Sequence, residues 1–163
     1  MTHAHAAPRS PQEQRKIAAA LTELYEQRIT FNQTLGLKVT AVFDDAGPAM
    51  QLPMRDALIG HYLYGRLHGG AISATLDAMG SFALLVALAH KHADEPCEQF
   101  MHRFTRMGTI DLRIDYLRQG IGRVFTATAD VTRLGGRVGS TLMRLVNDEG
   151  VLVATGAAAY MLN

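Results

Sequence analysis

The residues best suited to chemistry lie in one stretch, where His68, Gly69 and Gly70 are followed, nine positions after the histidine, by Asp77. Two glycines after a histidine predict a tight start to a helix, and the first N–H groups of a helix have no intrahelical partner. These groups, at the positive end of the helix dipole, can polarise an electronegative atom. Asp77 is the only charged residue between positions 71 and 89. Because burial of an unpaired carboxylate is costly, we expect Asp77 to be hydrogen-bonded or to line a cavity.

The spacing of Gly69 and Asp77 indicates how these two groups could act. At ~1.5 Å per residue they lie roughly 10–12 Å apart along the helix axis. That separation is too long for the Gly69 N–H and the Asp77 carboxylate of one subunit to act on one small group. A second copy of the chain could close the gap by offering its own helix start, so the spacing predicts a site shared between two subunits.

The composition favours one soluble domain, and its charge does not indicate a class of binding partner. The chain has 163 residues, with 16 basic and 15 acidic side chains and a net charge of +1. Neither a nucleic-acid footprint nor a polybasic membrane patch is present. Cys97 is the single cysteine, so no intrachain disulfide can form, and we expect this thiol to be inert. The first dozen residues hold no apolar signal segment, which predicts a cytoplasmic protein.

The apolar run at 71–89 is long enough to cross a membrane. A charged Asp77 near its middle would cost about 2.5–3.5 kcal/mol in a bilayer. We therefore interpret the run as the core helix of a protein without a membrane span.

The elements before this helix follow from local signals. Residues 1–10 are small and polar, which predicts disorder. Ser10, followed by a proline and then an acid, is typical of a helix start, and an amphipathic helix is predicted from there to about Asn32. Segments 35–42 and 49–54 predict a hairpin, and residues 59–66 predict a loop leading into the central helix.

The C-terminal half alternates with period two, which predicts strands. The first begins at Thr109, and its apolar face carries Ile110, Leu112, Ile114 and Tyr116. Three more are predicted at 124–134, 138–146 and 151–162, joined by glycine-rich turns as an antiparallel meander. Segment 94–108 predicts either a mobile flap or a short helix. The whole indicates an α+β fold, an antiparallel sheet curled around one buried helix, with surface left over to meet another subunit.

These motifs carry a family resemblance. The run Arg66-Leu67-His68-Gly69-Gly70, the acid at Asp77 and the strand at 108–118 resemble the hotdog-fold thioesterases of the phenylacetate-degradation (PaaI-like) type, and more closely their YigI-like branch. The resemblance covers residues 35–162. It implies a single hotdog thioesterase domain at 11–163. The implied enzyme is an acyl-CoA thioesterase that forms a homodimer, or a dimer of dimers, with its sites at the dimer interface.

The resemblance also implies roles for single residues. Gly69 would donate its N–H to the thioester carbonyl, and Asp77 of the partner subunit would act as nucleophile or as general base on water. Thr109 falls where relatives hold that water with a serine or threonine. His61, seven positions before His68, stands near the place where many relatives carry an asparagine. No metal or redox cofactor is expected, because coenzyme A enters only as part of the substrate.

Other residues of these segments are further candidates. His68 could hold the helix start or take part in catalysis, and Gly70 would help to bind the substrate. Arg118, Arg133 and Arg137 near strand ends could bind the phosphates of coenzyme A, since arginine pairs with phosphate bidentately.

Two rival functions stay open on this fold. One is a hydratase or dehydratase acting on acyl-CoA or acyl-carrier protein, in which Asp77 would work with His61 or His68. The other is a non-catalytic module that binds acyl thioesters. The acyl group itself could be aromatic, medium-chain or long-chain.

Overall fold

The computed structural model describes residues 9–162, which form helices, a main sheet of six strands and a small sheet of two strands. A short 3-10 helix, η2 (Asp56–Leu58), lies between these sheets in the chain. Three elements precede the sheet: α1 (Pro11–Glu23), the π-helical η1 (Leu24–Arg28) and α2 (Thr30–Leu35). The long helix α3 (Gly69–Lys91) is followed by α4 (Cys97–Met101) and the 3-10 helix η3 (His102–Arg106). The strands of the main sheet are β1 (Lys38–Ala41), β2 (Ala49–Pro53), β5 (Gly108–Tyr116), β6 (Val124–Leu134), β7 (Val138–Asn147) and β8 (Leu152–Met161).

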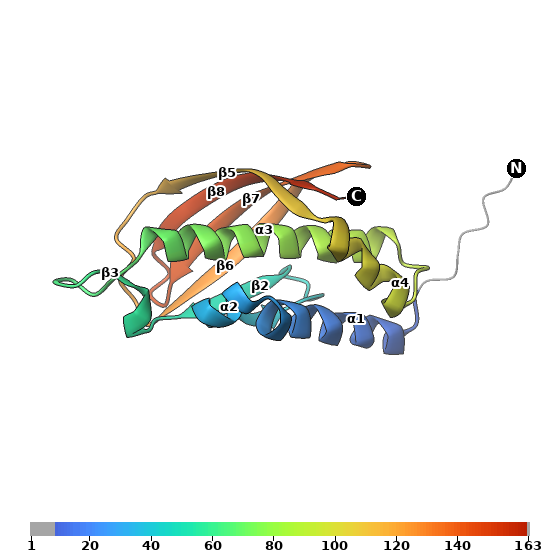
Figure 1. The fold of residues 1–163 in the computed structure, drawn as a ribbon, viewed down its shortest axis with the longest axis horizontal. Helices are drawn as coiled ribbons and strands as arrows, with labels where there is room; N and C mark the ends of the chain where they lie inside the picture. The colour runs from blue at the N-terminus through green and yellow to red at the C-terminus, as the bar shows by residue number, and fades with distance from the viewer. Residues whose placement is uncertain (1–8, 163) are drawn as a thin grey trace, which may run out of the picture.

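The main sheet has six antiparallel strands in the order β1-β2-β6-β7-β8-β5. It curves over α3, while α1 and α2 lie along the other side of that helix (Figure 1). This arrangement confirms the α+β architecture expected from the sequence, with the sheet around one central helix and an additional N-terminal helix.

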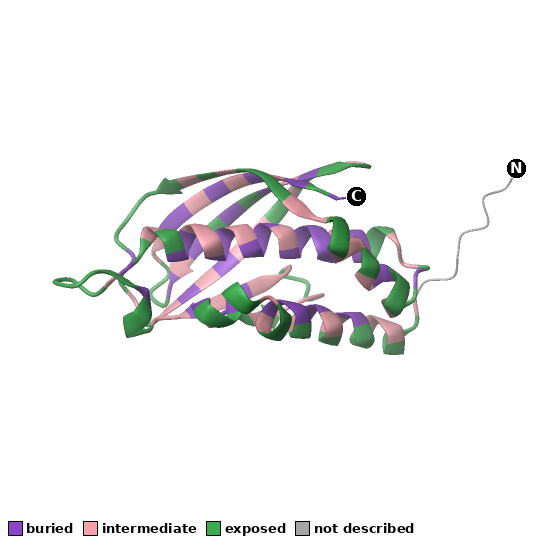
Figure 2. Ribbon diagram, in the orientation of Figure 1, coloured by how far each residue is buried: buried purple, intermediate pink, exposed green. Residues whose placement is uncertain are grey.

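Helix α3 forms the centre of the core. It carries fourteen buried residues, and buried segments alternate along the strands that face it (Figure 2). Among the described helices it alone has the length and apolar composition needed to cross a membrane, but 67% of that apolar window is buried inside the protein. Its interpretation as a core helix is confirmed.

The N-terminal helix starts as predicted but breaks into three parts. The Ser10 hydroxyl accepts a hydrogen bond from the N–H of Glu13 at 3.2 Å, which is the expected N-cap. One wide π-helical turn follows, and Ile29 then leaves the helical region with an extended backbone before α2. Gly36 ends α2 with φ +76°, a left-handed conformation that favours glycine. Periodicity alone could not distinguish this broken helix from a continuous one.

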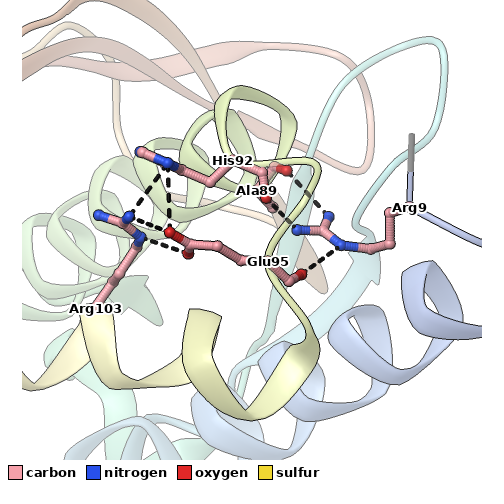
Figure 3. A network of polar contacts seen from close by, with 5 residues as sticks. All are labelled: Arg9, Ala89, His92, Glu95 and Arg103. Atoms are coloured by element: carbon pink, nitrogen blue, oxygen red, sulfur yellow. Dashed lines mark hydrogen bonds and ion pairs between the residues drawn. The ribbon is translucent and has the colours of Figure 1, made fainter. Parts of the chain in front are cut away.

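A polar network holds the start of the chain against the end of α3 (Figure 3). The Arg9 guanidinium donates to the carbonyl oxygens of Ala89 at 3.0 Å, His92 at 2.7 Å and Glu95 at 3.1 Å. Carbonyls at a helix C-terminus lack intrahelical partners, so a cation there satisfies them. Arg103 in turn donates to both carboxylate oxygens of Glu95. The predicted disorder at 1–10 is therefore wrong for Arg9 and Ser10, while residues 1–8 lie outside the described part.

Two predictions about the strands need correction. The last three strands form the meander, but β5 pairs with β8 rather than with the following strand β6. The link at 117–123 therefore spans the two strands, β8 and β7, that lie between β5 and β6. Within this link the Gly120 carbonyl accepts the N–H of Leu67 at 2.8 Å. The predicted loop at 59–66 contains a small hairpin of β3 (Ile59–His61) and β4 (Arg66–Leu67). Segment 94–108 contains short helices, which was one of its two predicted forms.

Strand β5 is less buried than its alternation suggests. Leu112 and Ile114 pack against the core, but Ile110 and Tyr116 are 59% and 55% exposed. A bulge between Thr109 and Asp111 shifts the register at Ile110. Because β5 is the last strand of the sheet, its outer edge has no partner within the described chain.

Candidate active site

The start of α3 is held by the side chain that precedes it. His68 is the N-cap residue, and its Nδ1 accepts the N–H of Gly70 at 2.8 Å. A neutral ring that accepts at Nδ1 carries its proton on Nε2. The structural role considered for His68 is confirmed by this contact. No hydrogen bond from the Gly69 N–H is found among the described residues, so this donor is free to bind an incoming oxygen.

Asp77 lies two turns further along α3, half-buried, and is held in two ways. Its Oδ1 accepts the hydroxyl of Thr109 at 2.9 Å, and its main-chain carbonyl accepts the hydroxyl of Tyr160 at 2.9 Å. Gly80 allows this approach, because a Cβ there would collide with the Tyr160 hydroxyl. Burial and the nearby Asp77 charge raise the Tyr160 pKa, so the phenol stays protonated and can donate. A carboxylate has about four acceptor sites, and Thr109 fills only one of those of Asp77 among the described residues.

The Asp77 carboxylate lines a cavity of about 240 Å³ that lies between α3, the N-terminal helices η1 and α2, and the 3-10 helix η3. One stripe of α3 forms its floor, since residues spaced three and four apart share a helix face. The walls come from η1, α2, η3 and the start of β5. The lining residues are Ala74, Asp77, Ala78 and Ser81 from α3; Tyr25, Ile29, Phe31 and Asn32 from the N-terminal segment; and Phe104, Met107, Gly108, Thr109 and Tyr160 from the rest. This cavity gives the charged residue of α3 the environment that the sequence predicted.

The two predicted catalytic groups sit at opposite ends of β5. Asp77 is bonded to Thr109 at the first end, as described above. At the other end the Tyr116 hydroxyl donates to the Gly69 carbonyl at 3.0 Å and lies 3.2 Å from the Ser73 hydroxyl. Within one protomer the Gly69 N–H and the Asp77 carboxylate therefore remain apart, as the helical spacing predicted.

His61 lies apart from Asp77. It is exposed at the end of β3, where its ring packs near those of Tyr62 and Tyr64, with centroids 5.9 and 4.8 Å away. This hairpin projects beyond the start of α3 (Figure 1). The proposed role of His61 in place of an asparagine stays a prediction.

The three arginines considered for phosphate binding do not converge within a protomer. Arg118 is exposed near the start of α3, where its side chain donates to the Leu152 carbonyl at 3.1 Å. Arg133 and Arg137 are exposed around the β6–β7 hairpin, at the opposite end of those strands. Of the three, Arg118 lies on the side of Gly69.

Several lining residues were not identified from the sequence. Ser81 could have been found, because it lies one helical turn after Asp77 on the same face. Tyr25 and Tyr160 reach the site from distant parts of the chain, and no local pattern marks them. Across residues 9–162 no group of three or more His, Cys, Asp or Glu side chains is arranged to hold a metal ion.

Comparison with known proteins identifies the family to which this fold belongs. Residues 64–154 match the thioesterase superfamily profile. Proteins of Salmonella typhimurium and Escherichia coli, both named medium/long-chain acyl-CoA thioesterase YigI, are 31% identical over 140 residues, which cover 86% of this chain and 90% of theirs. A Shewanella oneidensis crystal structure related to the thioesterase superfamily matches with a TM-score of 0.86 and 33% identity, covering 94% of this chain and 99% of that one. This chain belongs to the thioesterase superfamily, whose members share the hotdog fold described above.

Proposed function

We propose that this protein is an acyl-CoA thioesterase whose active site combines Asp77 of one protomer with Gly69 of its partner. The observation that carries the proposal is the placement of the two groups at opposite ends of β5. If the free edge of β5 pairs antiparallel with the same edge of a second copy, the Thr109 end of one strand meets the Tyr116 end of the other. Asp77 of one protomer would then face the Gly69 N–H of the other.

The exposed groups of β5 support such a pairing. A free strand edge is a ready template for another chain, and the apolar side chains of Ile110 and Tyr116 stand exposed beside it. In this dimer Arg118, close to Gly69, is the arginine best placed to contact a phosphate of coenzyme A. A dimer of dimers would leave this pairing unchanged.

The reaction is hydrolysis of the thioester. The Gly69 N–H, at the positive end of α3, would stabilise the negative charge that develops on the carbonyl oxygen. Asp77 would either attack the carbonyl carbon itself or take a proton from a water that attacks it. The C–S bond then breaks and the thiolate of coenzyme A leaves. If water attacks, the thiolate receives the proton that Asp77 removed, and the carboxylic acid is the other product. If Asp77 attacks, the thiolate is protonated by solvent, and a water then hydrolyses the acyl–Asp77 anhydride, which releases the carboxylic acid and restores the carboxylate. Thr109 would hold the Asp77 carboxylate in position for either route.

The substrate class is inferred from the names of the relatives and from the lining of the cavity. The relatives of Salmonella typhimurium and Escherichia coli are named for medium- and long-chain acyl-CoA, and the cavity beside Asp77 has largely apolar walls. We propose an acyl-CoA with an apolar acyl group. Hydratase chemistry is less favoured, because the carboxylate of Asp77 bonds to Thr109 and to no histidine among the described residues.

Release of free thiol from a panel of alkyl- and aryl-acyl-CoAs tests the proposed activity. The wild type should turn over at least one of them, and Asp77→Asn should lose about 10²-fold or more of kcat. Asp45→Asn, an exposed acid in the β1–β2 turn, is the matched control and should behave as wild type. Equal thiol release by wild type and Asp77→Asn would refute the assignment of Asp77.

A mixing experiment tests the shared site. Gly69→Pro removes the proposed donor, yet proline suits the first position of a helix and His68 before it is already extended. Gly69→Pro and Asp77→Asn should each be inactive alone. Equal mixing after dissociation should restore about a quarter of the wild-type activity, because half of the dimers would carry one intact site of two. Failure of mixed dimers to regain activity would indicate a site within one protomer.

A further inference from the structure

The cavity beside Asp77 is open at one side and closed at the other. Phe31 of α2 lines it while 59% exposed, so an apolar side chain stands at its rim. In the other direction the α3 stripe runs from Ala74 through Asp77 to Ser81, the last lining residue of the helix. The next turn of α3 is fully packed, since Leu84 and Leu85 are at most 1% exposed.

Tyr25 lines the cavity at this inner end, beside Ser81. It is 1% exposed, and its hydroxyl lies 2.8 Å from the Ser81 hydroxyl. Its ring meets Phe82 edge-on with centroids 4.9 Å apart, and Phe104 of η3 in the same manner at 6.3 Å. Neighbours on two sides and a hydrogen bond at the tip hold the ring in one position.

The backbone at Tyr25 is fixed as well. It lies in the π-helical turn η1, and the buried side chain of Asn32 donates to its carbonyl at 3.1 Å. A π-helical turn inserts an extra residue into a helix and is frequent at functional sites. Here Asn32 also lines the cavity, so the turn and the wall are stabilised by one contact.

The volume of the cavity indicates how many carbon atoms it can hold. A protein cavity of ~150 Å³ holds benzene, with six carbon atoms. By proportion, a cavity of about 240 Å³ has room for roughly eight to ten carbon atoms. The apolar rim and the carboxylate beside it suit an acyl chain that enters past Phe31 with its thioester near Asp77.

We propose that Tyr25, held by Ser81 and backed by Phe104, is the end wall that limits the acyl chain to medium length. The inference rests on the proposed thioesterase function and adds the residues that determine its specificity. An alkyl chain longer than the cavity would have to displace a packed, hydrogen-bonded ring. Shorter chains would leave apolar surface unfilled.

The test is the chain-length profile of kcat/KM for straight-chain acyl-CoAs from C4 to C16. The wild type should favour about C8–C10. Tyr25→Leu and Phe104→Ala, which open the same end from two elements, should each move the optimum at least two carbons longer. One methylene in a hydrophobic pocket is worth about 10–200-fold in specificity, so the ratio of C14 to C8 should rise at least tenfold. Tyr25→Phe keeps the ring and should keep the wild-type optimum.

Leu21→Ala is the matched control. Leu21 is fully buried one helical turn before Tyr25 but does not line the cavity, so its loss loosens the same segment without moving the wall. Its profile should match the wild type. Phe104 is only half-buried, so Phe104→Ala carries the test if Tyr25→Leu does not fold.

The outcomes separate this inference from the proposed function. An active wild type whose optimum stays fixed in Tyr25→Leu or Phe104→Ala would overturn the end wall and leave the thioesterase intact. A shift of the same size in Leu21→Ala, or an aryl-acyl-CoA preferred tenfold over every alkyl chain, would also overturn it. A folded wild type that releases no thiol from any acyl-CoA would overturn both.

Discussion

The two ends of α3 both gather charged and polar groups, but they differ in how fully these groups are bonded. At the C-terminal end Arg9 donates to three main-chain carbonyls, and Glu95 receives Arg103 on both oxygens (Figure 3). In the N-terminal half the Gly69 N–H has no acceptor among the described residues and Asp77 has one side-chain donor. Unused bonding capacity beside a cavity, rather than charge, separates the candidate site from a structural network.

The largest expected effect contrasts the carboxylates of these two ends. Asp77→Asn should reduce kcat by about 10²–10⁴, while its melting temperature stays within ~2 °C of wild type, because the amide can still accept from Thr109. Steady-state kinetics measures the loss of kcat, and thermal unfolding of the same preparation measures the melting temperature. A large loss of stability in Asp77→Asn would make this acid structural and remove the contrast.

Glu95→Gln should show the reverse pattern. Removing the charge from a nearly buried carboxylate that binds Arg103 should lower the free energy of unfolding by about 1–3 kcal/mol, with kcat/KM within about threefold of wild type. Urea unfolding measures the first quantity. Glu149→Gln, an exposed acid in the β7–β8 turn, should change stability by less than ~0.5 kcal/mol. If both variants were equally stable, the network would contribute nothing.

Thr109→Val should have a smaller effect on the catalytic side. The substitution keeps the shape but removes the hydroxyl that donates to Asp77, so we expect about a tenfold loss of kcat, equivalent to ~1.4 kcal/mol. Thr109→Ser retains the donor and should recover most of the activity. Stability should not change, because Thr109 is exposed. Full activity in Thr109→Val would show that Asp77 needs no such support.

Local patterns were sufficient to predict much of this contrast. The glycines after His68 and the lone acid at Asp77 are features of one helix, whose spacing is fixed by helical geometry. The family resemblance predicted that Thr109 holds the attacking water, but its hydrogen bond to Asp77 was not predicted, since the two residues lie 32 positions apart. The structural network was not predicted, because Arg9 reaches carbonyls 80 to 86 positions away.

The strand order shows the same limit. Alternation in β5 specifies which side chains share a face, but it does not specify the partner strand. Pairing with β8 leaves the edge of β5 free, and that free edge is what the proposed dimer uses. Tyr25 lies in an ordinary amphipathic pattern, so its place at the end of the cavity depends on the packing of η1 against α3.

The smallest expected effect is a pH dependence of the structural network. Burial, and then the nearby Arg103 charge, lowers the pKa of His92, whose Nδ1 lies 3.2 Å from an Arg103 nitrogen. The unfolded chain therefore binds a proton at His92 at a higher pH than the folded chain does. The contribution of His92 to stability is therefore fully present above pH 6.5, the ordinary histidine pKa, and is lost as the pH falls through the lowered pKa of the folded chain.

His92→Gln should remove this slope, since glutamine can accept from Arg103 but does not titrate. Below pH 4.5 a second loss of stability should begin. The hydrogen bond from Arg103 lowers the pKa of Glu95, so the unfolded chain binds a proton at Glu95 at a higher pH than the folded chain does. Urea unfolding from pH 8 to pH 4 separates the two steps. The exposed His102, changed to glutamine, should leave the slope between pH 6.5 and pH 5 as in wild type. If stability fell equally steeply with pH in His92→Gln, the pH dependence would not arise from His92 at this end of α3.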